Sequence, residues 1–209
     1  MKNIEPFMHD TFYHVYNRTN NKEALFKDED NFPYFIHLYR RYLEPFVHTY
    51  SYALLTNHFH FSISVKSVEE ISEVLSKIKV AYCTVPMSKY RFKENKGEFI
   101  HDLISGQFRR FFISYAKSIN KHYNRKGSLF QKRFKNPILN TAEKFTWNQY
   151  YIHHNARKHG LVDNFLDYPH TSYSHILLDS ESFLARDYLF NWFGNKISYE
   201  NFHLQTLEF

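Results

Sequence analysis

Strict alternation of polar and apolar side chains in residues 58–65, HFHFSISV, constrains the fold of this chain more than any other sequence feature. Successive side chains of a β-strand point to opposite faces, so one face would be apolar and the other polar. The apolar set is Phe59, Phe61, Ile63 and Val65, and the polar set is His58, His60, Ser62 and Ser64. We therefore expect a strand with one face in a hydrophobic core and both histidines on the other.

Further segments of the sequence have the character of strands. Residues 46–57, FVHTYSYALLTN, reach residue 58 through a tight Thr56-Asn57 junction, which predicts a β-hairpin. Residues 12–18, FYHVYNR, are aromatic and β-branched and stop at the polar turn TNN, so they predict a first strand. Residues 128–139, SLFQKRFKNPIL, predict the final strand of the sheet.

Two helices are expected in the first half of the chain. Apolar residues recur at helical spacing in NFPYFIHLYRRYLEP until Pro45 ends the pattern. Ser67 and Glu70 form a capping-box pattern at the start of an amphipathic stretch over residues 67–82. Residues 86–105 are polar and irregular, and they predict a loop or insertion.

Two more helices are expected after this loop. Residues 106–127 place apolar side chains on one face and basic side chains roughly opposite. Asn140 with Glu143 resembles a second capping box, which predicts one helix over residues 141–159 that ends at Gly160.

The order of these elements predicts the fold class. The expected elements follow one another as strand, helix, strand, strand, helix, strand and helix, and the insertion and its helix precede the last strand. This order is typical of an α+β sandwich with an antiparallel sheet and helices on one face. The ferredoxin-like βαββαβ arrangement is the simplest match. A chain of 209 residues suits one domain with an appended tail, in which residues 180–193 show a short helical pattern.

Composition indicates an acidic partner. A net charge of +6 and a pI near 9.2 favour nucleic acid or anionic lipid. Aromatic residues make up 20% of the chain, and aromatic rings among basic side chains suit the stacking of unpaired bases. The alternatives are an aromatic-rich core and a merely solvated basic face. The candidate phosphate contacts are Arg109, Arg110, Lys117, Lys121, Arg125, Lys132, Arg133, Lys135, Arg157 and Lys158.

The single cysteine, Cys83, allows neither an internal disulfide nor a cysteine-based zinc cluster, and we expect it to be a core residue. The first residues lack the apolar run of a signal peptide, and no stretch has the roughly 18 apolar residues of a membrane span. We therefore expect a cytoplasmic protein without a membrane partner.

Two histidines at positions i and i+2 of a strand lie on one face and can coordinate one divalent ion. An isolated pair is more often a hydrogen-bonded feature of a polar sheet face, and a zinc site would need further ligands. A helix that contains YYIHHNARKHGL adds Tyr151 and Asn155 at i and i+4 on one face. His58, His60 and Asn155 would then leave coordination positions open for a phosphate, as expected of Mg²⁺ or Mn²⁺.

These motifs together resemble a known family. NHFHFSISV resembles the histidine, hydrophobic, histidine motif of the HUH endonucleases, and YYIHHNARKHGLV followed by DYPHTSY resembles the tyrosine-helix region of the REP-associated tyrosine transposases. LFQKRFK and HVYNR are also similar to that family. The resemblance implies an HUH single-tyrosine domain over residues 1–178 and a C-terminal helical tail over residues 179–209. The chain departs from the family pattern at Ala156, where proline is usual.

The resemblance implies transesterification by a tyrosine nucleophile on single-stranded DNA beside REP-like hairpins. Tyr151 falls on the first residue of the family motif and would form a 5′-phosphotyrosine and release a 3′-hydroxyl. Tyr150 is the rival nucleophile, with His154 one turn later. Because such proteins act on DNA, we expect a nucleoid-associated location, and a monomer is favoured although related enzymes include dimers.

Two other functions remain open from the sequence. The first is a catalytically silent DNA or RNA hairpin-binding regulator that keeps the fold. The second is a replication or conjugation relaxase, although relaxases are usually much larger and carry partner domains.

Overall fold

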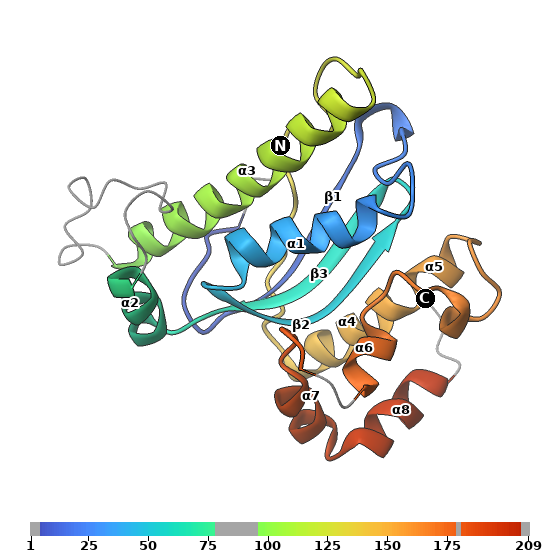
Figure 1. Cartoon of the computed structure of the whole chain (residues 1–209). Helices are drawn as coiled ribbons and strands as arrows, with labels where there is room; N and C mark the ends of the chain where they lie inside the picture. The colour runs from blue at the N-terminus through green and yellow to red at the C-terminus, as the bar shows by residue number, and fades with distance from the viewer. Residues whose placement is uncertain (1–4, 78–95, 179–180, 206–209) are drawn as a thin grey trace.

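A computed structural model describes residues 5–77, 96–178 and 181–205 of the chain (Figure 1). Cys83, residues 86–95 of the expected insertion and the end of the helix expected over residues 67–82 lie outside these residues. Among the described residues, no helix is both long and apolar enough to cross a membrane.

A three-stranded antiparallel sheet forms the centre of the molecule. Its strands are β1 (Phe12–Arg18), β2 (Val47–Leu55) and β3 (His58–Val65), in the order β1-β3-β2. The first strand and the hairpin predicted from the sequence are confirmed. The register between β1 and β3 places Tyr16 opposite His60 and Arg18 opposite His58, so β1 extends the face that carries the histidines.

The predicted final strand is present only as isolated bridges to β1. Phe130 bridges Thr19, Lys135 bridges Tyr16, and Ile138 bridges Tyr13, all in antiparallel sense. The ladder is not continuous, because the register against β1 shifts by two residues between Phe130 and Lys135 and because Pro137 has no N–H to donate. The mixed α/β class with an antiparallel sheet is therefore confirmed, whereas the complete fourth strand of a ferredoxin-like sheet is not formed in the described residues.

Two long helices cover the apolar face of the sheet (Figure 1). They are α1 (Asn31–Leu43) and α3 (Lys96–His122), and they pack on each other as well as on β3. Tyr39 of α1 stacks on Phe61 of β3 with ring centroids 4.0 Å apart. Large aromatic side chains bury 150–250 Å² each, so these stacked rings account for much of the core.

The expectation of a loop over residues 86–105 is wrong from Lys96 onward, where α3 begins. Phe99, Ile100, Leu103 and Ile104 are buried, and their spacing of three and four residues is that of an apolar helix stripe. The polar residues between them hid this periodicity. The shorter α2 (Val68–Lys77) begins as predicted, because Ser67 and Glu70 exchange both hydrogen bonds of a capping box.

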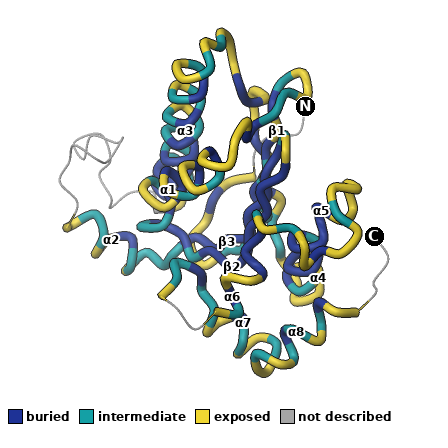
Figure 2. Tube along the Cα trace, turned by 45° about the vertical axis from the view of Figure 1, so that its right-hand side comes forward, coloured by how far each residue is buried: buried dark blue, intermediate teal, exposed yellow. Residues whose placement is uncertain are grey.

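The expectation that helices lie on one face only is also wrong. Helix α4 (Ala142–His153) packs on β2 and β3 from the side opposite to α1 and α3 (Figure 1). Gln149 of α4 donates from Nε2 to Ser62 Oγ at 2.9 Å, on the polar face of β3. That face is therefore covered, and β3 is buried along its whole length (Figure 2).

The tyrosine-bearing helix differs in detail from the expected continuous helix over residues 141–159. It starts with Thr141, whose side chain accepts a hydrogen bond from the Lys144 amide, so the Asn140 and Glu143 capping box is wrong by one residue. The helix is interrupted at His154, with φ −86° and ψ 2°, before the short α5 (Asn155–Lys158).

The C-terminal part of the chain packs against α4. It contains the 3-10 turn Phe165–Asp167 and the helices α6 (Tyr173–Leu177), α7 (Arg186–Phe193) and α8 (Lys196–Leu204). Another 3-10 turn, Asn20–Lys22, lies near the N-terminus, directly after β1. His203 of α8 is fully buried and accepts at Nε2 from His153 Nδ1 of α4 at 3.0 Å. The short helix expected within residues 180–193 is confirmed as α7, and α8 lies in the helical tail expected over residues 179–209, although no sequence pattern located it.

Candidate functional site

A pocket of about 330 Å³ lies on the polar side of the sheet, between β1, β3 and the tyrosine helix. The side chains that line it are mainly polar, basic or aromatic. They are Tyr16, Asn17, Arg18, His58, His60, Gln131, Arg133, Lys135, Tyr151 and His159. The structure thus brings the two predicted histidines, the predicted tyrosine and two predicted basic residues to one place.

His58 is held by contacts at both of its ring nitrogens. Its Nδ1 lies 2.7 Å from Asn57 Oδ1, the shorter of its two contacts with amide oxygens, so we assign the single N–H of the neutral ring to Nδ1 and the lone pair to Nε2. Nε2 lies 3.4 Å from Asn155 Oδ1. Two acceptor atoms therefore face each other, an arrangement that a cation between them would stabilise.

His60 presents an unpaired ring nitrogen. Its Nδ1 lies 2.8 Å from His14 Nε2, while its own Nε2 is buried and has no hydrogen-bond partner among the described residues. The Nδ2 atom of Asn155 is likewise buried without a partner there. Buried polar atoms are seldom left unpaired in a folded protein, and such atoms often lie where an ion, a water molecule or a ligand binds.

Burial keeps these imidazoles uncharged at neutral pH. Desolvation is the largest cause that lowers the pKa of His58 to about 4, and His159 adds to it. Desolvation also lowers the pKa of His60 well below its ordinary value, with a further contribution from His14. Neutral imidazole is the form that binds a metal ion.

The donor set at this pocket fits an open metal site of mixed nitrogen and oxygen ligands. Within residues 5–77, 96–178 and 181–205, no group of three or more His, Cys, Asp or Glu side chains could hold a metal ion. A cation here would thus depend on the imidazoles of His58 and His60 and the amide oxygen of Asn155. Three protein ligands leave positions open for phosphate oxygens or water.

Tyr151 and Tyr150 have different environments, although they are neighbours on α4. The ring of Tyr151 is half-buried, lines the pocket and meets the ring of His60 edge-on with centroids 5.7 Å apart. Tyr150 is fully buried, stacks on His154 with centroids 3.9 Å apart, and donates its hydroxyl to the Gln205 carbonyl at 3.0 Å. The geometry therefore favours Tyr151 as the residue that meets a substrate.

The predicted basic residues divide into groups. Arg133 and Lys135 are exposed and line the pocket, and Lys158 lies 4.7 Å from the centroid of the Tyr151 ring. Lys132 and Arg157 are exposed in the same two segments but do not line that pocket. Arg109, Arg110, Lys117 and Lys121 belong to α3, on the other side of the sheet (Figure 1).

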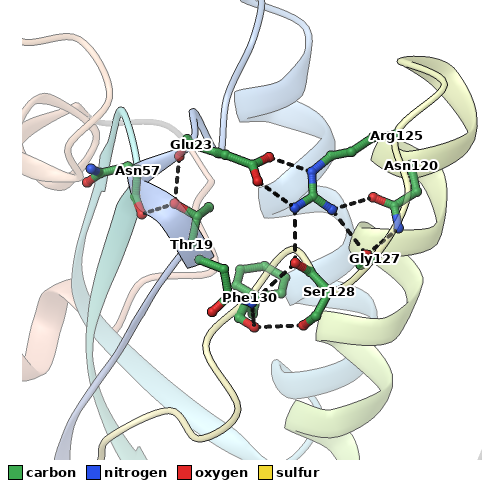
Figure 3. Close-up of polar contacts among 9 residues, drawn as sticks. Thr19, Glu23, Asn57, Asn120, Arg125, Gly127, Ser128 and Phe130 are labelled. Atoms are coloured by element: carbon green, nitrogen blue, oxygen red, sulfur yellow. Dashed lines mark hydrogen bonds and ion pairs between the residues drawn. The ribbon is translucent and has the colours of Figure 1, made fainter.

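Arg125 is a structural residue, and its assignment as a phosphate contact is corrected (Figure 3). Its guanidinium makes five hydrogen bonds: two to the Glu23 carboxylate, one to Asn120 and one each to the carbonyls of Gly127 and Ser128. A guanidinium has five N–H donors, so none remains for a phosphate. Arg125 instead ties the end of α3 to the segment after β1.

Several residues in or beside the pocket were missed by the sequence analysis, and one of them, His14, lines an adjoining pocket with His60 and Tyr151. His14, Tyr16 and Arg18 alternate along β1, and the antiparallel register with β3 brings them to the histidine face. That alternation was visible in FYHVYNR, but the register was not. His159 reaches the pocket because the chain turns after α5, and its ring centroid lies 4.8 Å from that of His58.

Comparison with known proteins gives one informative match. The sequence matches no protein-family model and no curated protein. The structure is similar to a solved structure of a REP-associated tyrosine transposase bound to a REP hairpin, with a TM-score of 0.58 and 12% sequence identity. The similarity covers 85% of each chain. At this identity the match shows a shared fold, which agrees with the mixed α/β architecture described above.

Proposed function

We propose that this protein is a metal-dependent single-stranded DNA endonuclease and strand transferase that cleaves next to DNA hairpins and rejoins the strand. The observation that carries the proposal is the convergence of Tyr151, His58 and His60 at one pocket with a basic rim, with Asn155 buried directly behind His58. The shared fold with a REP-associated tyrosine transposase supports it.

We further propose that His58, His60 and Asn155 hold Mg²⁺ or Mn²⁺. The unpaired Nε2 of His60 and the facing acceptors of His58 and Asn155 support this assignment. A divalent ion bound there supplies Lewis-acid polarisation of a phosphate oxygen. Asn57 holds His58 in place through Nδ1, so the lone pair of Nε2 is directed at the site before any ion arrives.

Tyr151 is the proposed nucleophile. Its phenolic oxygen forms a bond to phosphorus as the bond from phosphorus to the 3′-oxygen of the preceding nucleotide breaks. The phenol loses its proton and the departing oxygen gains one, which leaves a 5′-phosphotyrosine and a free 3′-hydroxyl. Rejoining is the reverse reaction, in which a 3′-hydroxyl attacks and Tyr151 leaves.

The proposed substrate is single-stranded DNA that flanks a REP-like hairpin. Arg133 and Lys135 at the pocket are suited to the phosphates next to the cleaved bond, and Lys132, Arg157 and Lys158 extend the basic surface. A monomer is proposed because one chain supplies both the metal ligands and the tyrosine. A nucleoid-associated, cytoplasmic location follows from this activity.

A labelled hairpin oligonucleotide with single-stranded flanks, incubated with Mn²⁺ and separately with a chelator, tests the proposal. We expect cleavage only with Mn²⁺, together with a protein-linked 5′ product. Binding without cleavage in both samples would instead identify a silent hairpin-binding regulator.

A further inference from the structure

His14 of β1 contacts both the proposed ligand His60 and the proposed nucleophile Tyr151. Its Nε2 is 2.8 Å from His60 Nδ1, and its ring centroid is 5.7 Å from that of Tyr151. Tyr16 packs on the same ring at 4.9 Å. The His14 ring thus has neighbours on β1, β3 and α4, and its contact with His60 joins two adjacent strands of the sheet.

The hydrogen bond between His14 and His60 has two possible directions with opposite consequences. If His14 donates from Nε2, the neutral His60 carries its proton on the buried, unpartnered Nε2 and has no lone pair for a metal. If His60 donates from Nδ1, its Nε2 carries a lone pair that is directed at the site. In that case His14 is protonated on Nδ1 and acts as the acceptor.

We propose that His14 is a positioning residue that accepts the Nδ1 proton of His60 and thereby fixes His60 in the tautomer that can bind a metal. This inference rests on the proposed metal site and assigns to it an outer residue that the sequence analysis did not identify. Hydrogen-bond partners behind a metal-bound histidine commonly fix its tautomer and ring orientation. Burial favours this direction too, because a buried N–H without a partner is costly.

A symmetrical arrangement at His58 supports the assignment. His58 donates from Nδ1 to Asn57 Oδ1 at 2.7 Å, which leaves its Nε2 as the ligand atom. His14 would therefore fix the tautomer of His60 in the same way as Asn57 fixes the tautomer of His58. Both imidazoles of the histidine pair then present Nε2, from one strand face, to the same site.

The test uses two variants of His14 and two readouts. Nitrogen-15 chemical shifts of the His60 ring in the metal-free protein report which nitrogen carries the proton, and calorimetry with Mn²⁺ reports affinity. We expect a protonated Nδ1 in the wild type. His14→Leu removes the acceptor and should shift the proton toward Nε2 and weaken Mn²⁺ binding by about 10- to 100-fold, as loss of an outer partner typically does.

His14→Gln restores an acceptor oxygen and should recover most of the affinity, and His37→Leu, at an exposed site on α1, controls for the loss of a histidine. A wild-type His60 protonated on Nε2 would overturn the inference. So would a folded His14→Leu variant with unchanged ring shifts and unchanged Mn²⁺ affinity. Because the shifts are measured without metal, they decide the hydrogen-bond direction even if the wild type fails to cleave DNA.

Discussion

His58 Nε2 lies 3.4 Å from Asn155 Oδ1, and the hydrogen bond of His58 Nδ1 to Asn57 makes both of these atoms acceptors. The contact joins β3 to the segment that follows the tyrosine helix. Facing acceptors repel each other in a buried setting, where electrostatic interactions are strong. A divalent cation would turn this repulsion into coordination, and it would couple the position of Tyr151 to that of the histidine pair.

The first prediction concerns the cation. The double variant His58→Ala, His60→Ala should abolish Mn²⁺ binding in calorimetry, because only the Asn155 oxygen remains of the proposed ligands. Asn155→Ala should weaken binding by more than about tenfold. His37→Ala is the matched control on an exposed helix surface and should bind as the wild type does. Unchanged binding by the double variant would show that the ion is held elsewhere.

The second prediction separates the two basic surfaces by their response to salt. On single strands, log K falls with log salt by about 0.7 per phosphate contact. Arg133→Ala, Lys135→Ala should reduce that slope, because both side chains line the pocket. Arg109→Ala, Lys117→Ala removes the same charge from α3 and should leave the slope nearly unchanged. Equal effects from the two pairs would place α3 in the DNA interface.

The third prediction concerns Arg125. Arg125→Met keeps the length of the side chain and removes all five hydrogen bonds to the segments around Glu23 and Gly127. We expect a lower free energy of unfolding in urea and no change in DNA affinity of the folded protein. Arg109→Met, at an exposed position of α3, should leave stability unchanged. A variant of normal stability with weakened DNA binding would restore Arg125 as a phosphate contact.

The fourth prediction concerns acid sensitivity. Burial lowers the pKa of His203 from 6.5 to about 4, although its hydrogen bonds to the Tyr199 and Gln149 backbones act the other way. The unfolded chain therefore binds more protons than the folded one between these values, so stability falls as pH drops from 6.5 toward 4. Each such group contributes a slope of at most about 1.4 kcal/mol per pH unit.

Urea unfolding at several pH values measures this slope. His203→Gln keeps an acceptor for His153 but does not titrate, so the slope between pH 6.5 and 4 should become shallower by up to that amount. If the free energy of unfolding depends on pH identically in the variant and the wild type, then His203 has the same pKa in the folded and unfolded chains, which contradicts the prediction.

The strands of the central sheet could be predicted from the sequence because their signals are local. Alternation in residues 58–65 and the Thr56-Asn57 turn depend only on neighbouring residues, and both are confirmed. The start of α3 was missed because charged residues interrupt its apolar stripe. The prediction that all helices pack on one side of the sheet was wrong for α4. It treated the polar face of β3 as open to solvent, whereas Gln149 of α4 and Ser62 of β3 form a buried polar contact there.

The candidate site was predictable only in part, because only some of its residues lie in local sequence motifs. His58, His60, Tyr151 and Asn155 lie in two short motifs, each with spacing that the sequence reveals. His14 reaches the site through the pairing of β1 with β3, which depends on register between segments 46 residues apart. The role of Arg125 depends on Glu23, and no local pattern connects them.

The covalent protein and DNA adduct tests the central claim most directly. Wild type, Tyr151→Phe and Tyr150→Phe are each incubated with a labelled hairpin oligonucleotide and Mn²⁺, resolved on a denaturing gel, and the modified peptide is identified by mass spectrometry. Tyr151→Phe keeps the ring packed on His60 and removes the one oxygen that the reaction needs, so DNA binding should persist while the adduct disappears. Tyr150→Phe loses the hydrogen bond to the Gln205 carbonyl and should still form the adduct on Tyr151. An adduct that persists in Tyr151→Phe and is lost in Tyr150→Phe would contradict the account.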